Sequence, residues 1–129
     1  RLGIAMKRAG GGAIVSLSDW GALHPYPFYA AYNIAKGGIL TMTRALAREL
    51  APEVRVNALA LGPILAPEGA KPRGPSLSLD LVPLGTGGSP DDVAEAVRFL
   101  LDEASYMTGE AMPFDGGRHL IPAGVHGTP

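Results

Sequence analysis

A tyrosine and a lysine four residues apart are the side chains of this sequence best suited to chemistry. They open and close the run YNIAK at positions 32–36, which we expect to be helical. Residues at i and i+4 of a helix lie on one face a turn apart, so the Lys36 ammonium would face the Tyr32 phenol. A nearby cation favours the phenolate, and we therefore expect Lys36 to lower the pKa of Tyr32 from its usual value of about 10. Such a tyrosine can exchange a proton with a substrate.

A second group of polar residues follows a short apolar run. Residues 13–18 are mostly aliphatic and predict a buried strand of a parallel sheet. Functional groups in such sheets gather beyond the carboxyl ends of the strands, which makes Ser18, Asp19 and Trp20 candidates to bind a substrate. Two structural alternatives stay open: Asp19 could cap the following turn, and Trp20 could simply pack in the interior.

The elements that must position these residues can be traced from the periodicity. An opening helix, residues 2–9, is predicted to end at a run of three glycines, and a long helix is expected from about Tyr29 to Leu50, ended by Pro52. Residues 54–61 read as a second buried strand. Within this strand, Asn57 is expected to satisfy backbone or loop groups.

The second half of the chain begins with a segment rich in proline and glycine, residues 65–88, which we interpret as a loop that covers a substrate. The sequence SPDD at 89–92 is typical of a helix start, with Ser89 as N-cap, proline at the first helical position and carboxylates at the positive end of the helix dipole. Residues 110–114 predict a last strand. Helices and strands thus alternate, which indicates an α/β fold with a doubly wound parallel sheet.

Two stretches of the sequence carry a resemblance to a known family. The run FYAAYNIAKGGILTMTRALARELAPEVRVNALALGP and the later segment TGEAMPFDGG resemble the carboxyl-terminal half of short-chain dehydrogenases/reductases, and the similarity extends from about residue 13 to residue 120. The resemblance implies that Tyr32 is the proton donor and that Lys36 holds the nicotinamide ribose. It also implies that the loop of Gly62, Pro63 and Ile64 meets the nicotinamide, although Gly62-Pro63 reverses the family's usual Pro-Gly order.

The resemblance also bears on domain organisation. Residues 1–129 would form the carboxyl-terminal part of one Rossmann-type domain, because no glycine-rich phosphate-binding fingerprint lies between a strand and a helix. The sheet is therefore expected to continue past its amino-terminal side. Such a piece should by itself neither bind a dinucleotide well nor fold stably, and we expect it to be inactive in isolation.

The residue thirteen positions before the tyrosine separates two hypotheses for the reaction. Most relatives place a serine there, whereas this chain has Asp19, with Ser18 one position away. Asp19 resembles the aspartate of pteridine reductases, which acts together with the tyrosine and the lysine. A carboxylate can accept hydrogen bonds from the amino and ring N–H groups of a pterin, but it would repel an oxygen that develops negative charge.

The resemblance therefore implies an NADPH-dependent reductase of a pterin or dihydrofolate-like substrate, with catalytic Asp19, Tyr32 and Lys36. NADH is not excluded as the cofactor. The alternative is a carbonyl reductase or dehydrogenase that acts on a keto or hydroxy substrate, such as a 3-oxoacyl thioester or a sugar, with Ser18 in the serine role. The family implies a homotetramer or a homodimer.

Composition excludes several other classes of function. A net charge of −1 gives no basic surface for nucleic acid or anionic lipid, and no apolar run approaches the length of a membrane span. The absence of cysteine removes disulfides and thiolate metal sites. His24, His119 and His126 lack metal-ligand spacing, so we expect no metal and place all three on surfaces or loops. We expect a cytoplasmic protein that binds a small-molecule substrate.

Overall fold

Helices and strands alternate along the chain, as the sequence predicts. The computed structural model describes residues 1–65 and 79–121. Its main elements are α1 (Leu2–Arg8), β1 (Gly12–Asp19), α2 (Ala30–Leu50), β2 (Val54–Leu61), α3 (Pro90–Arg98) and β3 (Ala111–Phe114). Short helical turns, η1 (Trp20–Ala22) and η5 (Arg118–Leu120), follow β1 and β3. The predicted substrate-covering loop falls largely on residues 66–78 and lies outside the described residues.

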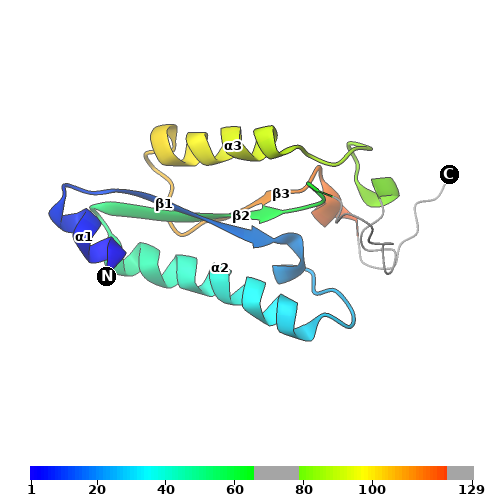
Figure 1. The fold of residues 1–129 in the computed structure, drawn as a ribbon, viewed down its shortest axis with the longest axis horizontal. Coiled ribbons are helices and arrows are strands. Elements are labelled where there is room, and N and C mark those ends of the chain that lie inside the picture. The colour runs from blue at the N-terminus through cyan, green and yellow to red at the C-terminus, as the bar shows by residue number, and fades with distance from the viewer. Residues whose placement is uncertain (66–78, 122–129) are drawn as a thin grey trace.

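The three strands form one parallel sheet in the order β1-β2-β3. The helix α2 covers one face of this sheet and α3 covers the other, which confirms the doubly wound arrangement (Figure 1). The register pairs Asp19 with Leu61 and Leu61 with Phe114. All three strands therefore end level with one another, and the residues that follow them meet at a single edge of the sheet.

Each face of the sheet has its own apolar core because successive side chains of a strand point to opposite faces. On the α2 side, Val54 and Val56 of β2 pack with Ala47 and Leu50. On the α3 side, Leu59 of β2 packs with residues of α3 and of the turn that follows it, namely Val93, Leu100 and Ala104. The central strand β2 thus contributes to both cores, and six of its eight residues are essentially inaccessible to solvent.

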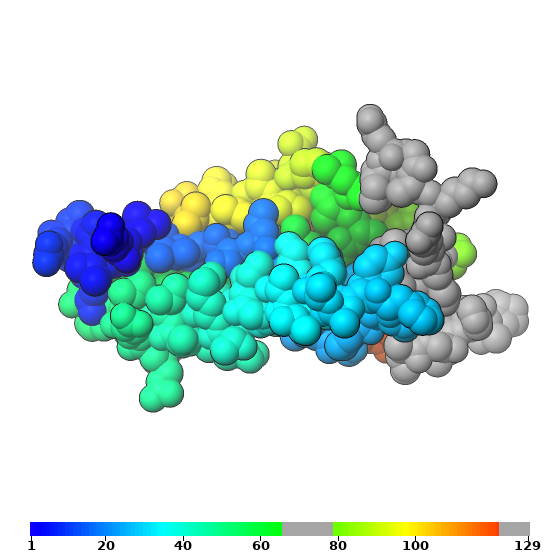
Figure 2. All heavy atoms as spheres, turned by 60° about the horizontal axis from the view of Figure 1, so that its bottom comes forward, coloured from blue at the N-terminus to red at the C-terminus, as the bar shows by residue number. Residues whose placement is uncertain are grey.

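The carboxyl end of the long helix α2 is determined by Pro52 and stabilised by Lys7. Pro52 lies two residues beyond Leu50 and cannot extend the helical hydrogen-bond ladder. The Lys7 ammonium of α1 lies 3.5 Å from the carbonyl oxygen of Glu49 and 3.4 Å from that of Ala51, where a cation is favourable. In Figure 2, α2 runs across the face of the molecule turned toward the viewer, with α1 at one end of it.

The prediction that Asn57 satisfies backbone groups of a neighbouring loop is confirmed. Its Nδ2 donates to the Met107 carbonyl oxygen at 2.8 Å, and its Oδ1 accepts from the Glu110 N–H at 3.1 Å. The side chain is 1% exposed, so both backbone groups would lack a partner without it. Asn57 thereby fixes the loop that leads into β3.

Candidate active site

The carboxylate of Asp19 and the hydroxyl of Tyr32 meet at the end of β1. The Tyr32 hydroxyl donates a hydrogen bond to Asp19 Oδ2 at 2.9 Å. The other carboxylate oxygen, Oδ1, accepts from the Gly21 N–H at 2.6 Å and caps η1. Asp19 therefore caps the turn and at the same time contacts the tyrosine of α2, while its predicted role toward a substrate stays a prediction.

Ser18 points the other way, into the interior. It is 2% exposed, and its hydroxyl donates to the carbonyl oxygen of Lys36 at 2.9 Å. This hydrogen bond fastens β1 to α2 one turn from Tyr32. The structure therefore brings Asp19 to the tyrosine, while Ser18 supports the helix beneath it.

Lys36 occupies the predicted face of α2, one turn after Tyr32. Its Nζ lies 5.8 Å from the centre of the Tyr32 ring and 3.5 Å from the carbonyl oxygen of Leu17. Across residues 1–65 and 79–121, Lys36 forms no ion pair. Its remaining N–H donors are consequently free to hold the hydroxyl groups of a ligand.

The expectation that Lys36 lowers the pKa of Tyr32 is wrong for this structure. Burial, the hydrogen bond to Asp19 and the charge of Asp19 together raise the pKa of Tyr32 to about 12. The reason is geometric, because the ammonium stands over the ring whereas the carboxylate contacts the hydroxyl directly. At neutral pH Tyr32 is therefore a neutral phenol that donates its proton toward Asp19.

Trp20 is packed in the interior and is only 2% exposed. One face of its ring stacks on His24, with centroids 4.8 Å apart, and the guanidinium of Arg118 lies 4.5 Å from the ring centre. Arg118, in η5, is itself 3% exposed. Trp20 thus joins the turn after β1 to the turn after β3, and its predicted role in substrate binding stays a prediction.

Tyr26 is a residue of this site that sequence reasoning missed. Its ring centre lies 5.5 Å from that of Trp20 and 6.4 Å from that of Tyr32. Burial, followed by the charge of Asp19, raises the pKa of Tyr26 well above its usual value. No spacing rule could have found this residue, because it lies in an irregular loop whose path is set by tertiary contacts.

The loop of Gly62, Pro63 and Ile64 leaves β2 at the same edge. The Gly62 N–H donates to the Phe114 carbonyl oxygen at 2.9 Å, and a side chain at Gly62 would lie 2.6 Å from the Asp115 Cα. Glycine is therefore required for this close approach to the end of β3. The loop is thereby held against the strand next to it.

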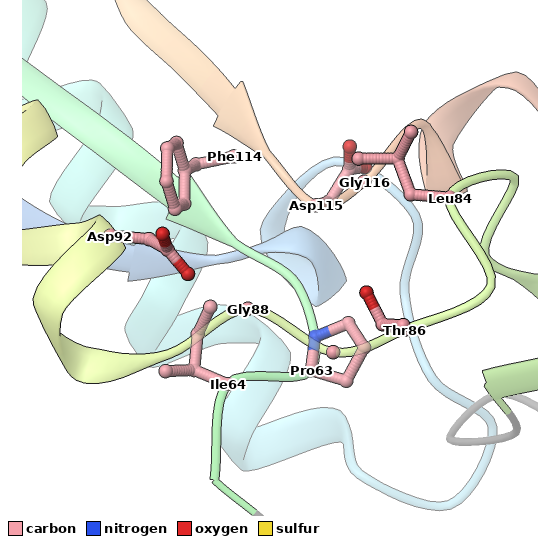
Figure 3. Close-up of a pocket in the computed structure, with 10 residues that line it drawn as sticks. Pro63, Ile64, Leu84, Thr86, Gly88, Asp92, Phe114, Asp115 and Gly116 are labelled. Carbon is pink, nitrogen blue, oxygen red and sulfur yellow. The ribbon is translucent and has the colours of Figure 1, made fainter.

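A hollow of about 290 Å³ opens beside this loop. Figure 3 shows Pro63 and Ile64 on one side of it, with Phe114 and Asp115 of the β3 end across from them. The other lining residues come from the segment that leads into α3, from the first turn of α3 and from the turn after β3: Leu84, Thr86, Gly87, Gly88, Asp92 and Gly116. The walls are mainly apolar and offer an aromatic ring, which suits a flat heterocycle.

The histidines confirm their assignment to surface or loop positions where they can be seen. His24 is exposed. His119 is half-buried, with its Nδ1 3.0 Å from Asp115 Oδ1. Within the described ranges, no group of three or more His, Asp or Glu side chains could hold a metal ion. His126 lies outside them.

Comparison with known proteins identifies this arrangement. A family model described as enoyl-(acyl carrier protein) reductase matches residues 2–119. The chain belongs to the short-chain dehydrogenase/reductase family. It is an oxidoreductase family whose members depend on NAD(P), and the tyrosine and lysine found one turn apart on α2 are those that the sequence resemblance marked as functional.

Individual relatives agree with this assignment. The chain is 40% identical to 3beta-hydroxysteroid dehydrogenase 1 of Eggerthella lenta over 86% of its own length and 45% of that protein. It is 38% identical to the 3-oxoacyl-[acyl-carrier-protein] reductase FabG of Thermotoga maritima over 82% of its length and 45% of that protein. A short-chain dehydrogenase/reductase from Mycobacterium ulcerans superimposes with a TM-score of 0.82 at 34% identity, covering 92% of this chain and 46% of that one.

The chain spans about half the length of the curated relatives it matches. In the described part of the chain, no helix has the length and apolar character needed to cross a membrane.

Proposed function

We propose that this protein transfers hydride between a nicotinamide dinucleotide and a substrate carbon that bears a hydroxyl or keto oxygen. The observation that carries the proposal is the 2.9 Å hydrogen bond from the Tyr32 hydroxyl to Asp19, one turn from the Lys36 ammonium, which forms no ion pair in the part of the chain that the structure describes. Both side chains belong to α2 and stand where the parallel strands end. Lys36 is suited to the ribose hydroxyls, and the hollow beside Pro63 and Ile64 is suited to a flat ring.

The geometry lets Tyr32 and Asp19 handle the proton in both directions. The dinucleotide, when bound, supplies or accepts the hydride at the substrate carbon. In oxidation, the substrate hydroxyl passes its proton to the Tyr32 oxygen while the Tyr32 proton moves to Asp19, which becomes neutral and later releases that proton to solvent. Reduction is the reverse: Asp19, protonated from solvent, returns a proton to Tyr32 as the Tyr32 hydroxyl gives its own proton to the substrate oxygen.

The activities for which two relatives are named support a keto or hydroxy substrate. One is a 3beta-hydroxysteroid dehydrogenase and the other a 3-oxoacyl-[acyl-carrier-protein] reductase, so each name specifies an oxygen-bearing carbon. A proton relay through Tyr32 also answers the objection that Asp19 would repel a developing alkoxide. The substrate oxygen never faces the carboxylate directly, since the phenol lies between them.

A pterin or dihydrofolate-like substrate is the second candidate, and Asp19 is the observation that favours it. In the described structure a carboxylate, and not a serine hydroxyl, contacts the catalytic tyrosine. A carboxylate can accept hydrogen bonds from the amino and ring N–H groups of a pterin, and reduction of a C=N bond requires a proton at nitrogen. Tyr32 could supply that proton.

We propose NADPH as the cofactor. NADH is the alternative, and both dinucleotides are tested in each assay. We further propose a cytoplasmic homotetramer or homodimer that acts on a small molecule. Two large apolar side chains on α2, Ile34 and Met42, are 75% and 46% exposed and support assembly through this helix. Light scattering of the protein at its full natural length would measure the oligomer size.

The test is a set of turnover assays with the protein at its full natural length. Wild type, Tyr32→Phe, Asp19→Ser and Ser18→Ala are each assayed with a hydroxysteroid, a 3-oxoacyl thioester and dihydrobiopterin, using NADPH and NADH. We expect Tyr32→Phe to lower turnover by about 10²- to 10⁴-fold, since it removes the proton donor. Wild-type turnover by Tyr32→Phe would refute the proposal.

The aspartate variant separates the two substrate classes. For a keto substrate we expect Asp19→Ser to retain reduction, because serine supplies the neutral hydroxyl that most relatives use. For a pterin we expect Asp19→Ser to lose about 10- to 150-fold, the range for a lost ionic hydrogen bond. Ser18→Ala serves as the matched control, since among the described residues the Ser18 hydroxyl hydrogen-bonds only to the Lys36 backbone.

A further inference from the structure

The segment between η1 and α2 contains a turn with an unusual residue in it. Pro27 and Phe28 are the two central residues of a β-turn, in which the Tyr29 N–H donates to the Tyr26 carbonyl oxygen at 3.3 Å. Phe28 has a φ of 69°, and a proline followed by a positive φ is the pattern of a type II turn, whose second central position usually holds glycine. Phenylalanine at this position strains the backbone, because its Cβ comes too close to the following carbonyl oxygen.

The Phe28 side chain gains no packing in the described part of the chain that would offset this strain. It is 104% exposed, so the whole ring faces solvent. A glycine at this position would remove both the strain and the exposed apolar surface. A strained residue at the edge of a site points to a function, and an exposed aromatic ring is suited to a contact that forms on binding.

Asn33 of α2, which directly follows Tyr32, holds the turn in place. Its Oδ1 accepts from the Tyr26 N–H at 3.2 Å, and its Nδ2 donates to the Tyr26 carbonyl oxygen at 2.9 Å. The same carbonyl oxygen accepts the Tyr29 N–H that closes the turn. The backbone that carries the Phe28 ring is therefore fixed relative to Tyr32.

Tyrosine rings connect Phe28 to the reacting hydroxyl. The ring of Tyr26 lies 6.4 Å from that of Tyr32 and 6.3 Å from that of Tyr29, the neighbour of Phe28. Tyr32 and Tyr29 are both partly exposed, and the segment lies at the end of the molecule where the strands end (Figure 1). Residues 20–35 contain no Asp, Glu, Lys or Arg, so this aromatic surface offers no ionic partner to a phosphate or a carboxylate.

We propose that Phe28 is a specificity-determining residue that contacts the apolar body of the substrate, and that this substrate is a rigid ring compound bearing the keto or hydroxyl group. The inference rests on the proposed function, since the Tyr32 hydroxyl determines where the reacting oxygen binds. With that oxygen at Tyr32, a flat and uncharged ring system lies along the tyrosine rings and reaches Phe28. A small ketone that fills only the reacting end does not contact Phe28.

Phe28→Gly tests this contact, with Tyr106→Gly as the matched control. Tyr106 is 103% exposed, but it precedes β3 and so lies at the opposite edge of the sheet. A fused-ring ketosteroid and cyclohexanone are compared as substrates of the protein at its full natural length. We expect Phe28→Gly to lower kcat/KM by about 10-fold or more for the ketosteroid, chiefly through KM, and by less than about twofold for cyclohexanone. Tyr106→Gly should change neither value by more than about twofold.

The melting temperature distinguishes this role from packing within the protein. Because glycine adopts a positive φ without strain, Phe28→Gly should unfold at or above the wild-type temperature. A lower melting temperature would show that the ring packs within the protein and would overturn the inference.

Light scattering tests whether a second copy of the chain covers Phe28 instead. Phe28→Gly should keep the mass of the wild-type assembly. A smaller mass, with kcat/KM for the ketosteroid unchanged, would place the ring at a contact between subunits and would overturn the inference.

The outcomes separate this inference from the function on which it rests. Equilibrium binding of the ketosteroid to Tyr32→Phe needs no turnover, and adding Phe28→Gly in that background should weaken the binding by about 10-fold or more. If Tyr32→Phe turns over like wild type, the proposed function fails and the role of Phe28 fails with it. If Tyr32→Phe loses activity while Phe28→Gly matches Tyr106→Gly in turnover and in binding, the proposed function stands and only the role of Phe28 is overturned.

Discussion

At the scale of the residue, the charge beside Tyr32 decides what the phenol does. A carboxylate contacts its hydroxyl, whereas the ammonium of Lys36 lies over the ring. The ionised phenol is therefore disfavoured, and its pKa of about 12 leaves Tyr32 protonated at any physiological pH. Proton transfer at this site then depends on the pair Asp19 and Tyr32 acting together.

Replacing Asp19 with asparagine should lower the pKa of Tyr32. The substitution removes the negative charge next to the hydroxyl but leaves the burial, which is the first cause of the shift, so the pKa should fall and remain above about 10. Absorbance titration of phenolate, taken as the difference from a Tyr32→Phe variant, measures it. Ser18→Ala should leave the titration unchanged, and an unshifted midpoint in Asp19→Asn would contradict the assignment.

The same shift predicts how stability changes in alkali. The folded pKa of Tyr32, about 12, exceeds its unfolded value of 10, so the unfolded chain loses this proton first as pH rises. The free energy of unfolding should therefore be unaffected below about pH 10 and fall between pH 10 and pH 12. Urea unfolding at several pH values checks this, and Tyr32→Phe should fall less steeply than wild type over that window.

At the scale of the element, hydrogen bonds between residues close in the sequence determine where a helix begins. Ser89 caps α3 through a reciprocal pair of bonds, in which its Oγ accepts from the Asp92 N–H at 3.1 Å and Asp92 Oδ2 accepts from the Ser89 N–H at 2.8 Å. The Ser89 hydroxyl, which donates to Asp92 Oδ2 at 2.7 Å, and the Ser89 N–H together hold the pKa of Asp92 below its usual range. The start of α3 borders the hollow beside Pro63.

Ser89→Ala should destabilise the fold by about 0.5–2 kcal/mol, the usual cost of a lost N-cap. Chemical denaturation of Ser89→Ala and of wild type measures this difference in the free energy of unfolding. Ser105→Ala is the matched control, because Ser105 is exposed and its side chain makes no hydrogen bond within the described residues. Equal stability of Ser89→Ala and Ser105→Ala would show that the capping box contributes nothing.

Two glycines in contrasting surroundings give a paired prediction. Alanine at Gly62 would place a methyl group 2.6 Å from the Asp115 Cα and should cost about 1–3 kcal/mol, because two backbones must separate. Alanine at Gly38, which lies in α2 with open space around it, should stabilise by up to about 1 kcal/mol. The melting temperature should therefore fall for Gly62→Ala and rise for Gly38→Ala. A melting temperature of Gly62→Ala above that of wild type would contradict the close approach of the two backbones.

At the scale of the whole molecule, β2 contributes side chains to both apolar cores. Its Asn57 side chain also hydrogen-bonds the loop that leads into β3. The Asn57 side chain hydrogen-bonds Met107 and Glu110, next to the Ala58 N–H, which donates to the Glu110 carbonyl oxygen at 2.8 Å. Removal of the Asn57 side chain leaves the Met107 carbonyl oxygen and the Glu110 N–H, both at partly buried hydrogen bonds, without this partner. The position of the β3 end, and with it one wall of the hollow, rests on this side chain.

Asn57→Ala should therefore destabilise the molecule by about 1–3 kcal/mol for each orphaned group. Denaturant unfolding provides the number. Asn33→Ala, which also removes an amide that binds two backbone groups, is the control, since Asn33 is at the surface end of the site and should cost less stability. The interpretation fails if Asn57→Ala unfolds at the wild-type midpoint.

The sequence by itself determined the elements and their order. The period of apolar residues, the proline after α2 and the cap of α3 act within a few residues, and these local effects predicted β2 at its observed bounds and α2 to within a residue. The spacing of Tyr32 and Lys36 put them one turn apart on the helix. The role of Asn57 followed from a polar residue in a buried strand.

Only the tertiary structure decided which groups meet at the site. Whether Asp19 or Ser18 reaches Tyr32 depends on the direction in which β1 turns at its end, and Tyr26 arrives through a loop that carries no periodic signal. The predicted lowering of the Tyr32 pKa was wrong because it also depended on a tertiary contact, the one between Tyr32 and Asp19. Electrostatic interactions depend on distances between atoms, and helix spacing gives the distance from Lys36 along α2 but not the distance from Asp19 across the strand end.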